Sequence, residues 1–259
     1  MSLGEHFLEL RKRLMISAIA VAVALIAGWF MRMWVWDVLR QPVYDIAENQ
    51  GRTTSINYGD VMSGFDLQVQ IALFIAVLLA SPVWLYQIWA FLSPGLTKKE
   101  KLYTVGFFGT AIPLFLVGVF AGWKIFPNIV RLLISFAPTE DTALLTARPY
   151  LDMAIKLMLA VGVGFVVPVF IVLLNFVGVL SAKSILKSWR IAILSIILFA
   201  GITTPAADLI SMFLLAVPMV LLYFIAAGIA TLHDRRVKKK MDAEFAEYDL
   251  EESSSEVSD

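Results

Sequence analysis

The stretch MAIKLMLAVGVGFVVPVFIVLLNFV, residues 153–177, decides the fold class of this chain. Its one charged side chain, Lys156, stands close to its start. An α-helix rises about 1.5 Å per residue, so about 20 apolar residues cross the hydrocarbon core of a bilayer. The stretch therefore predicts a transmembrane helix.

Other stretches of the same kind lie on both sides of it. With 59% apolar residues and a mean hydropathy of +0.80, the 259-residue chain is too apolar for a soluble domain of this length. We predict an all-α, polytopic membrane protein with six transmembrane helices, at 14–31, 67–92, 105–126, 153–177, 191–203 and 209–230. The fifth has an apolar length of only about 20 Å and turns into the sixth through Thr204-Pro205-Ala206-Ala207.

Basic residues predict the orientation of these spans. Of the 21 Lys and Arg residues, 14 fall in the N-terminal segment, the second–third loop, the fourth–fifth loop and the tail. These segments share one side of the predicted topology, and the positive-inside rule makes that side cytoplasmic. We therefore expect both termini in the cytoplasm.

Two terminal segments flank the predicted membrane domain at 14–235. Residues 1–13 carry an apolar stripe of Leu3, Phe7 and Leu10 at helical spacing, which predicts an amphipathic helix on the inner surface. Residues 236–259 are first basic, then acidic and serine-rich, and we expect them to be a disordered cytoplasmic tail.

Two carboxylates near the predicted inner surface are candidates for binding a cation. Glu9 lies four residues before Arg13, so the two side chains can pair with each other. Glu100 stands among Lys98, Lys99 and Lys101, where it can either balance the lysines at a helix start or accept a guanidinium through two parallel hydrogen bonds. Composition and spacing leave both interpretations open for each acid.

Other function classes find less support. The chain has no cysteine, no HExxH, no G-x-S-x-G and no Gly-rich phosphate loop, so we expect no enzyme and no cofactor. His6 and His233 are far apart in sequence, and we expect no metal site. A small-solute carrier or channel is the main alternative, but no titratable residue lies in the middle of a predicted span. A purely structural scaffold is a weaker alternative, which would need neither Glu9 nor Glu100.

Five stretches together resemble the TatC family, the multispanning core of the twin-arginine protein translocase. They are HFLELRKRL at 6–14, ASPVWLYQIWAFLSPGLTKKEK at 80–101, PLFLVGVFAGWKIFP at 113–127, GVGFVVPVFIVLLNFVGVL at 162–180 and TTPAADLISMFLLAVPMVLLY at 203–223. The first two carry the most specific part of the likeness.

The resemblance implies a glove-like arrangement of six helices with the last two short. It also implies the function, which is to recognise twin-arginine signal peptides and to export folded proteins across the cytoplasmic membrane using the proton-motive force. The implied partners are the signal peptides of folded precursors and TatA- and TatB-type single-span subunits, in a hetero-oligomer within the lipid bilayer. No nucleic-acid partner is expected.

The resemblance also assigns roles to individual residues. The implied signal-peptide site takes in residues from the N-terminal segment and the second–third loop: Glu9, Arg11, Phe91, Pro94 and Glu100. The positions associated with assembly and later steps lie on the outer side: Pro42, Phe65 and Asp208. Positions that are often polar in the family are held here by Val166, Met212 and Phe224.

Overall fold

A computed structural model describes residues 3–50, 54–92, 101–136, 143–204 and 209–256. Within these residues the elements follow in the order α1 (Leu3–Gln50), β1 (Thr54–Asn57), α2 (Ser63–Leu79), α3 (Ser81–Leu92), α4 (Lys101–Ser135), β2 (Ala143–Thr146), α5 (Ala147–Phe176), α6 (Ala182–Lys187), α7 (Trp189–Thr203) and α8 (Leu209–Glu256).

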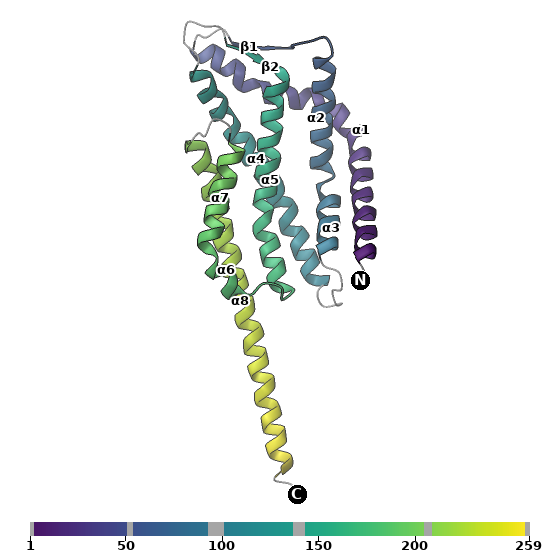
Figure 1. The fold of residues 1–259 in the computed structure, drawn as a ribbon, viewed down its shortest axis with the longest axis vertical. Helices are drawn as coiled ribbons and strands as arrows, with labels where there is room; N and C mark the ends of the chain where they lie inside the picture. Colours follow the sequence, from purple (N-terminus) through teal and green to yellow (C-terminus); the bar gives the residue numbers. More distant parts are fainter. Residues whose placement is uncertain (1–2, 51–53, 93–100, 137–142, 205–208, 257–259) are drawn as a thin grey trace.

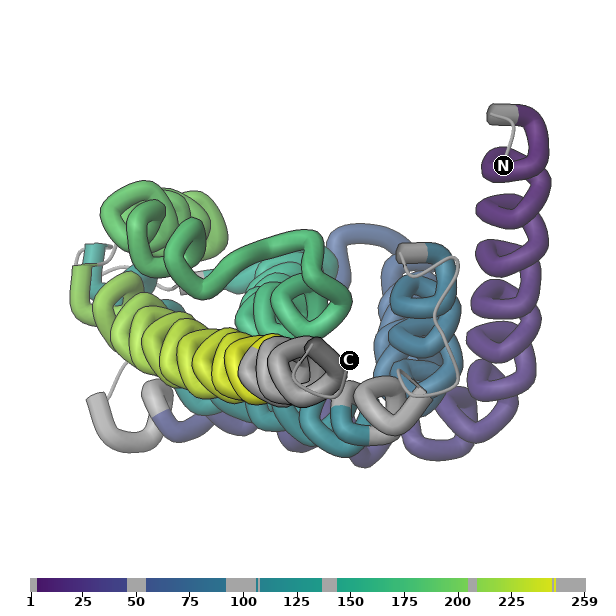
Figure 2. The backbone as a smooth tube through the Cα atoms, turned by 90° about the horizontal axis from the view of Figure 1, so that it is seen from below, coloured from purple at the N-terminus to yellow at the C-terminus, as the bar shows by residue number. Residues whose placement is uncertain are grey.

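The helices form a curved row rather than a closed bundle, with α1 at one edge (Figure 2). One end of the molecule carries β1 and β2 and is called the sheet end below (Figure 1). The opposite, N-terminal end carries the start of α1, the end of α3, the start of α4 and the end of α5 (Figure 1). The predicted helical, multi-pass fold is confirmed.

The number of spans stays a prediction. By length and composition, four helices can each cross a membrane: α1, α4, α5 and α8. The pair α2 and α3 adds a fifth if it counts as one span bent by 58°. The remaining candidate, α7, has 15 residues and is short, as expected for the fifth span.

The bend between α2 and α3 interrupts the segment predicted as one span at 67–92. Pro82 lies in the first turn of α3, where its missing N–H is tolerated, but it cannot continue the hydrogen bonding of α2. Across the bend, the indole N–H of Trp84 donates to the Val77 carbonyl at 2.9 Å. A side chain thus satisfies a backbone acceptor that a straight helix would satisfy itself.

Glycines allow two helix pairs to approach closely. A Cβ on Gly118 of α4 would lie 2.8 Å from the Cα of Gly162 in α5, and one on Gly122 would lie 2.9 Å from the Cα of Met158. A Cβ on Gly28 of α1 would overlap the backbone carbonyl oxygen of Ala72 in α2. Small residues at such crossings bring helix backbones into contact inside a membrane.

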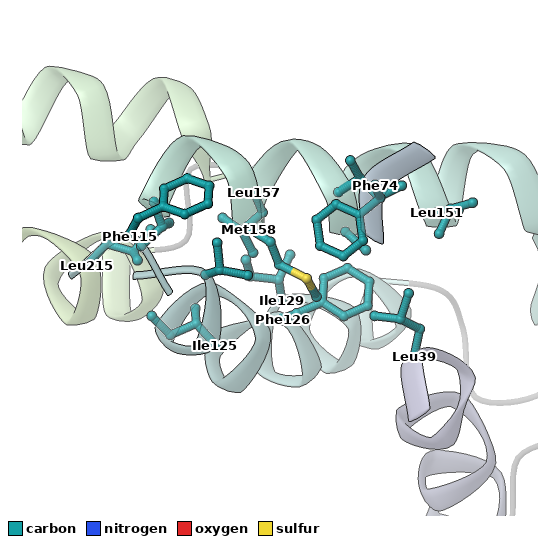
Figure 3. Packing of buried hydrophobic residues seen from close by; sticks show 14 of the residues in the cluster. Leu39, Phe74, Phe115, Ile125, Phe126, Ile129, Leu151, Leu157, Met158 and Leu215 are labelled. Atoms are coloured by element: carbon teal, nitrogen blue, oxygen red, sulfur yellow. The ribbon is translucent and has the colours of Figure 1, made fainter. Parts of the chain in front are cut away.

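The buried core follows the α4–α5 crossing. Phe115, Phe126 and Ile129 of α4 are fully buried against Leu157 and Met158 of α5, as Figure 3 shows. Toward the sheet end, the Tyr150 hydroxyl of α5 donates a 2.7 Å hydrogen bond to the Leu39 carbonyl of α1. The central helix pair therefore also holds the second half of α1.

Three features differ from the sequence-based expectations. The segment 32–66, a loop between the first two predicted spans at 14–31 and 67–92, contributes the end of α1 and strand β1. This strand pairs in parallel with β2 from Thr54↔Ala143 to Asn57↔Thr146. The backbone is helical on both sides of residue 13, so α1 is one continuous helix of 48 residues. The domain boundaries at 13 and 235 remain predictions.

The third difference is the tail. Expected to be disordered, it continues α8 as a helix to Glu256 and projects beyond the rest of the molecule (Figure 1). Its Lys, Glu, Ala and Met residues are strong helix formers, and an existing helix extends at little cost because the nucleation step is already complete.

A pair of glycine substitutions tests the α4–α5 crossing. Gly118→Ala should lower the free energy of unfolding by about 1–3 kcal/mol, because the added methyl group overlaps the backbone of α5. Gly109→Ala in the same helix is the matched control, since a Cβ there meets nothing within 4 Å. Thermal unfolding of the purified protein in detergent compares the two. Equal transition midpoints would show that the crossing is not closely packed.

Candidate functional site

The first four turns of α1 carry an ion pair at the N-terminal end of the molecule. Glu9 and Arg13 lie one turn apart on the same face of the helix, and the Arg13 Nη2 atom is 2.5 Å from Oε1 of Glu9. The Arg13 Nε atom donates to the same oxygen at 3.1 Å. The pairing that the spacing made possible is therefore present.

A residue of α3 joins this pair. The Arg13 Nη1 atom donates to Oε1 of Gln87 at 3.3 Å, which connects α1 to α3. The side chains of Glu9 and Arg13 are each 22% exposed, so the pair is largely shielded from water. A charge-assisted contact is stronger there than on an open surface.

One carboxylate oxygen of this cluster accepts no hydrogen bond from a described residue. The Oε2 atom of Glu9 is buried and has no hydrogen-bond partner among the described residues. A buried carboxylate oxygen without a donor is costly, so it favours any ligand that brings one. Arginine and lysine side chains, or backbone N–H groups, would supply it.

An aromatic contact lies close in sequence to this cluster. His6 of α1 and Phe91 of α3 stack with their ring centroids 4.5 Å apart and an interplanar angle of 28°. Phe91 precedes the last residue of α3, so this contact lies where the chain leaves α3 toward the second–third loop. Together with the Arg13–Gln87 hydrogen bond, it holds the start of α1 beside the end of α3.

Of the other residues predicted to bind the signal peptide, the structure describes Arg11 but not Pro94 or Glu100. Arg11 is exposed on α1 and forms no ion pair with a described residue. Pro94 and Glu100 lie outside the described residues. The chain leaves α3 after Leu92 and enters α4 at Lys101, and both of these points lie at the N-terminal end (Figure 1).

The residues predicted for the outer side lie elsewhere. Pro42 is buried in α1, and Phe65 is exposed on α2. Phe65 contacts Trp29 edge to face, with their centroids 6.4 Å apart. Asp208 lies outside the described residues.

The structure adds polar contacts that sequence reasoning missed. Gln70 of α2 donates a hydrogen bond to Asp152 of α5. Nearby, the Arg148 Nη1 atom lies 3.3 Å from Oδ2 of Asp66. Gln87 was missed as well, although an amide side chain within the otherwise largely apolar segment 83–92 was a usable signal.

Comparison with known proteins shows the family to which this chain is similar. The family model described as Sec-independent protein translocase protein (TatC) matches residues 5–218. The Sec-independent protein translocase protein TatC of Xylanimonas cellulosilytica is 38% identical over 240 residues, which cover 93% of this chain and 87% of that protein. The protein of the same name from Rothia mucilaginosa is 35% identical over 242 residues, which cover 93% of this chain and 83% of that protein.

The fold has solved counterparts. A crystal structure of the twin arginine translocase receptor TatC in DDM superposes with a TM-score of 0.72 at 26% identity. The match covers 87% of this chain and 99% of that one. A second crystal structure of the twin arginine translocase receptor TatC gives a TM-score of 0.69 at 27% identity.

The contribution of the shielded ion pair can be measured. Arg13→Gln should lower the free energy of unfolding by about 1 kcal/mol, because it leaves the largely buried Glu9 carboxylate without its cation. Lys12→Gln, at an exposed neighbouring position, should leave stability unchanged. Thermal unfolding in detergent checks both variants. If the two variants unfold at the same temperature, the Glu9–Arg13–Gln87 cluster does not stabilise the fold.

Proposed function

Because the chain belongs to the TatC family of Sec-independent protein translocase proteins, we propose that its N-terminal end binds the arginine pair of twin-arginine signal peptides. The family resemblance seen in the sequence is confirmed, and the chain is a multi-pass membrane component of a protein translocase. Signal-peptide recognition is the step that the geometry at this end supports best.

The observation that carries the proposal is the unsatisfied oxygen of Glu9. Oε1 already accepts from Arg13, whereas the buried Oε2 has no donor among the described residues. A guanidinium matches a carboxylate through its planar fork of N–H groups, which a lysine ammonium cannot reproduce. An incoming arginine either donates to Oε2 or displaces Arg13 from the carboxylate.

A second carboxylate completes the proposed site. Two arginines need two anionic partners, and Glu100 is the acid in the segment between α3 and α4. Phe91 stacks on His6 near the end of α3, shortly before that segment begins, and we assign it to the site as an apolar contact. Arg11 and Pro94 are the other residues that we assign to this site.

The wider setting is proposed as well. The charge asymmetry of the loops supports a cytoplasmic N-terminal end and insertion in the cytoplasmic membrane. TatA- and TatB-type single-span subunits are the proposed partners in a hetero-oligomer that exports folded proteins using the proton-motive force. A translocase subunit of this kind has no need of a catalytic centre of its own, and we propose that the chain is not an enzyme.

The residues of the outer side have a separate proposed role. We assign Pro42, Phe65 and Asp208 to assembly and to steps after binding.

Photo-crosslinking in membranes tests the binding site. A signal peptide with a photoreactive residue beside its arginine pair should crosslink to the wild-type protein. The yield should fall about tenfold in Glu9→Gln or Glu100→Gln, because each change removes a charge-assisted contact. Replacing both arginines of the peptide with lysine should give a similar loss.

Asp242→Asn is the matched control, because it neutralises an exposed carboxylate on α8 without touching the proposed site. Its crosslinking yield should equal that of the wild type. If Glu9→Gln and Glu100→Gln also bind like the wild type, neither acid receives an arginine. The N-terminal cluster would then only connect α1 to α3.

A substitution of Asp208 should impair export without impairing binding of the signal peptide. We expect Asp208→Ala to abolish export of a folded precursor while the crosslinking yield of the signal peptide stays at the wild-type level. Asp37→Ala, which removes an exposed acid of α1, is the comparison variant. Loss of crosslinking in Asp208→Ala would move this residue into the recognition site.

A further inference from the structure

Two adjoining hollows follow α8 toward the N-terminal end. The first is an apolar groove of about 380 Å³ between three helices. Gly106 and Leu114 of α4, Pro168 and Val172 of α5, and Leu222 and Ile225 of α8 are among its lining residues. The second hollow, also about 380 Å³, shares Phe176 and Ile229 with the first, so the two form one continuous groove.

The second hollow differs from the first in charge. It is lined by apolar side chains together with three basic residues of α8: His233, Arg236 and Lys240. These lie at i, i+3 and i+7, so they share one face of the helix. The groove therefore begins with apolar walls and ends at a cluster of nitrogen donors.

Among the described residues, no carboxylate forms an ion pair with the Arg and Lys of this cluster, Arg236 and Lys240. The neighbouring acid, Asp234, is directed toward the end of α5 and the start of α6. Its Oδ1 accepts from Asn175 of α5 at 2.9 Å, and its Oδ2 accepts from the Ala182 backbone N–H of α6 at 2.7 Å. Its remaining contact is with His233, whose Nδ1 atom lies 3.7 Å from Oδ1.

The dimensions match one leaflet of a bilayer. From Leu222 to Arg236 the axis of α8 rises about 21 Å at about 1.5 Å per residue. Half of a bilayer, including its headgroup region, measures about 20–22 Å. A chain lying along the apolar part would thus place its headgroup beside the basic residues.

We propose that this groove binds one anionic phospholipid from the leaflet at the N-terminal end. One of its acyl chains lies between α4, α5 and α8, and its phosphate accepts hydrogen bonds from Arg236 and Lys240. Basic pockets between transmembrane helices recognise acidic headgroups in this way. Charge complementarity favours such a lipid over a partner's transmembrane helix, since an apolar helix would gain nothing from the cations.

Native mass spectrometry of the full chain, released from nanodiscs of phosphatidylglycerol and phosphatidylcholine, tests the proposal. The wild type should retain one phosphatidylglycerol in preference to phosphatidylcholine. The double variant Arg236→Gln, Lys240→Gln should retain it about tenfold more weakly. The matched control Lys238→Gln, Lys239→Gln removes the same charge from α8 outside the hollow and should bind like the wild type.

A third variant tests the apolar part of the groove. Thr110 is exposed on α4 and lines the first hollow, so Thr110→Phe fills it without disturbing the core. Retention of phosphatidylglycerol should fall in this variant although every basic residue remains. A thermal unfolding midpoint equal to that of the wild type verifies that each variant is folded.

Three outcomes would overturn the proposal. Equal losses in the two double variants would reduce the effect to general surface charge. Displacement of the lipid by inorganic phosphate, with Thr110→Phe unchanged, would indicate a free-anion site. Loss of a co-purifying single-span partner in Thr110→Phe, with lipid retention intact, would make the groove a helix-docking site.

Discussion

The close approach of α4 and α5 is the constraint on which the rest of the molecule depends. In lipid, helices gain little from hiding apolar surface, because the solvent is as apolar as their side chains, so close packing must hold them together. Gly118, Gly122 and Gly162 let the two backbones touch, and Phe115, Phe126 and Leu157 fill the space around the crossing.

Both ends of this helix pair position other elements. At the sheet end, Tyr150 bonds to the Leu39 carbonyl and Asp152 accepts from Gln70, which ties α1 and α2 to α5. At the N-terminal end, α5 ends at Phe176, and Gly178 follows with a φ of +80° that suits glycine, while Asn175 donates to Asp234 of α8. Phe176, the last residue of α5, lines both hollows of the groove along α8.

Much of the fold was predictable because the bilayer restricts the choices. Long apolar runs must become helices, since every backbone polar group has to be satisfied within its own segment. Hydropathy therefore located the membrane segments, and the short apolar run at 191–203 predicted the short helix α7. The bend at Ala80 was harder to predict from the sequence, because Pro82 disfavours a straight helix but does not determine the angle of the bend. The helical tail and the β1–β2 pair were missed, because the tail has a charged, polar composition and each strand has only 4 residues.

The sequence by itself determined the membrane class through its long apolar runs and the family through the motifs that resemble TatC. Spacing within one helix made the Glu9–Arg13 pairing possible. Only the tertiary structure decided that Gln87 joins this pair, that Glu9 keeps one oxygen without a donor among the described residues, and that α8 carries a basic groove. Each of these depends on which residues of separate helices meet. That choice is made by close packing between helices, which periodicity along a single chain does not record.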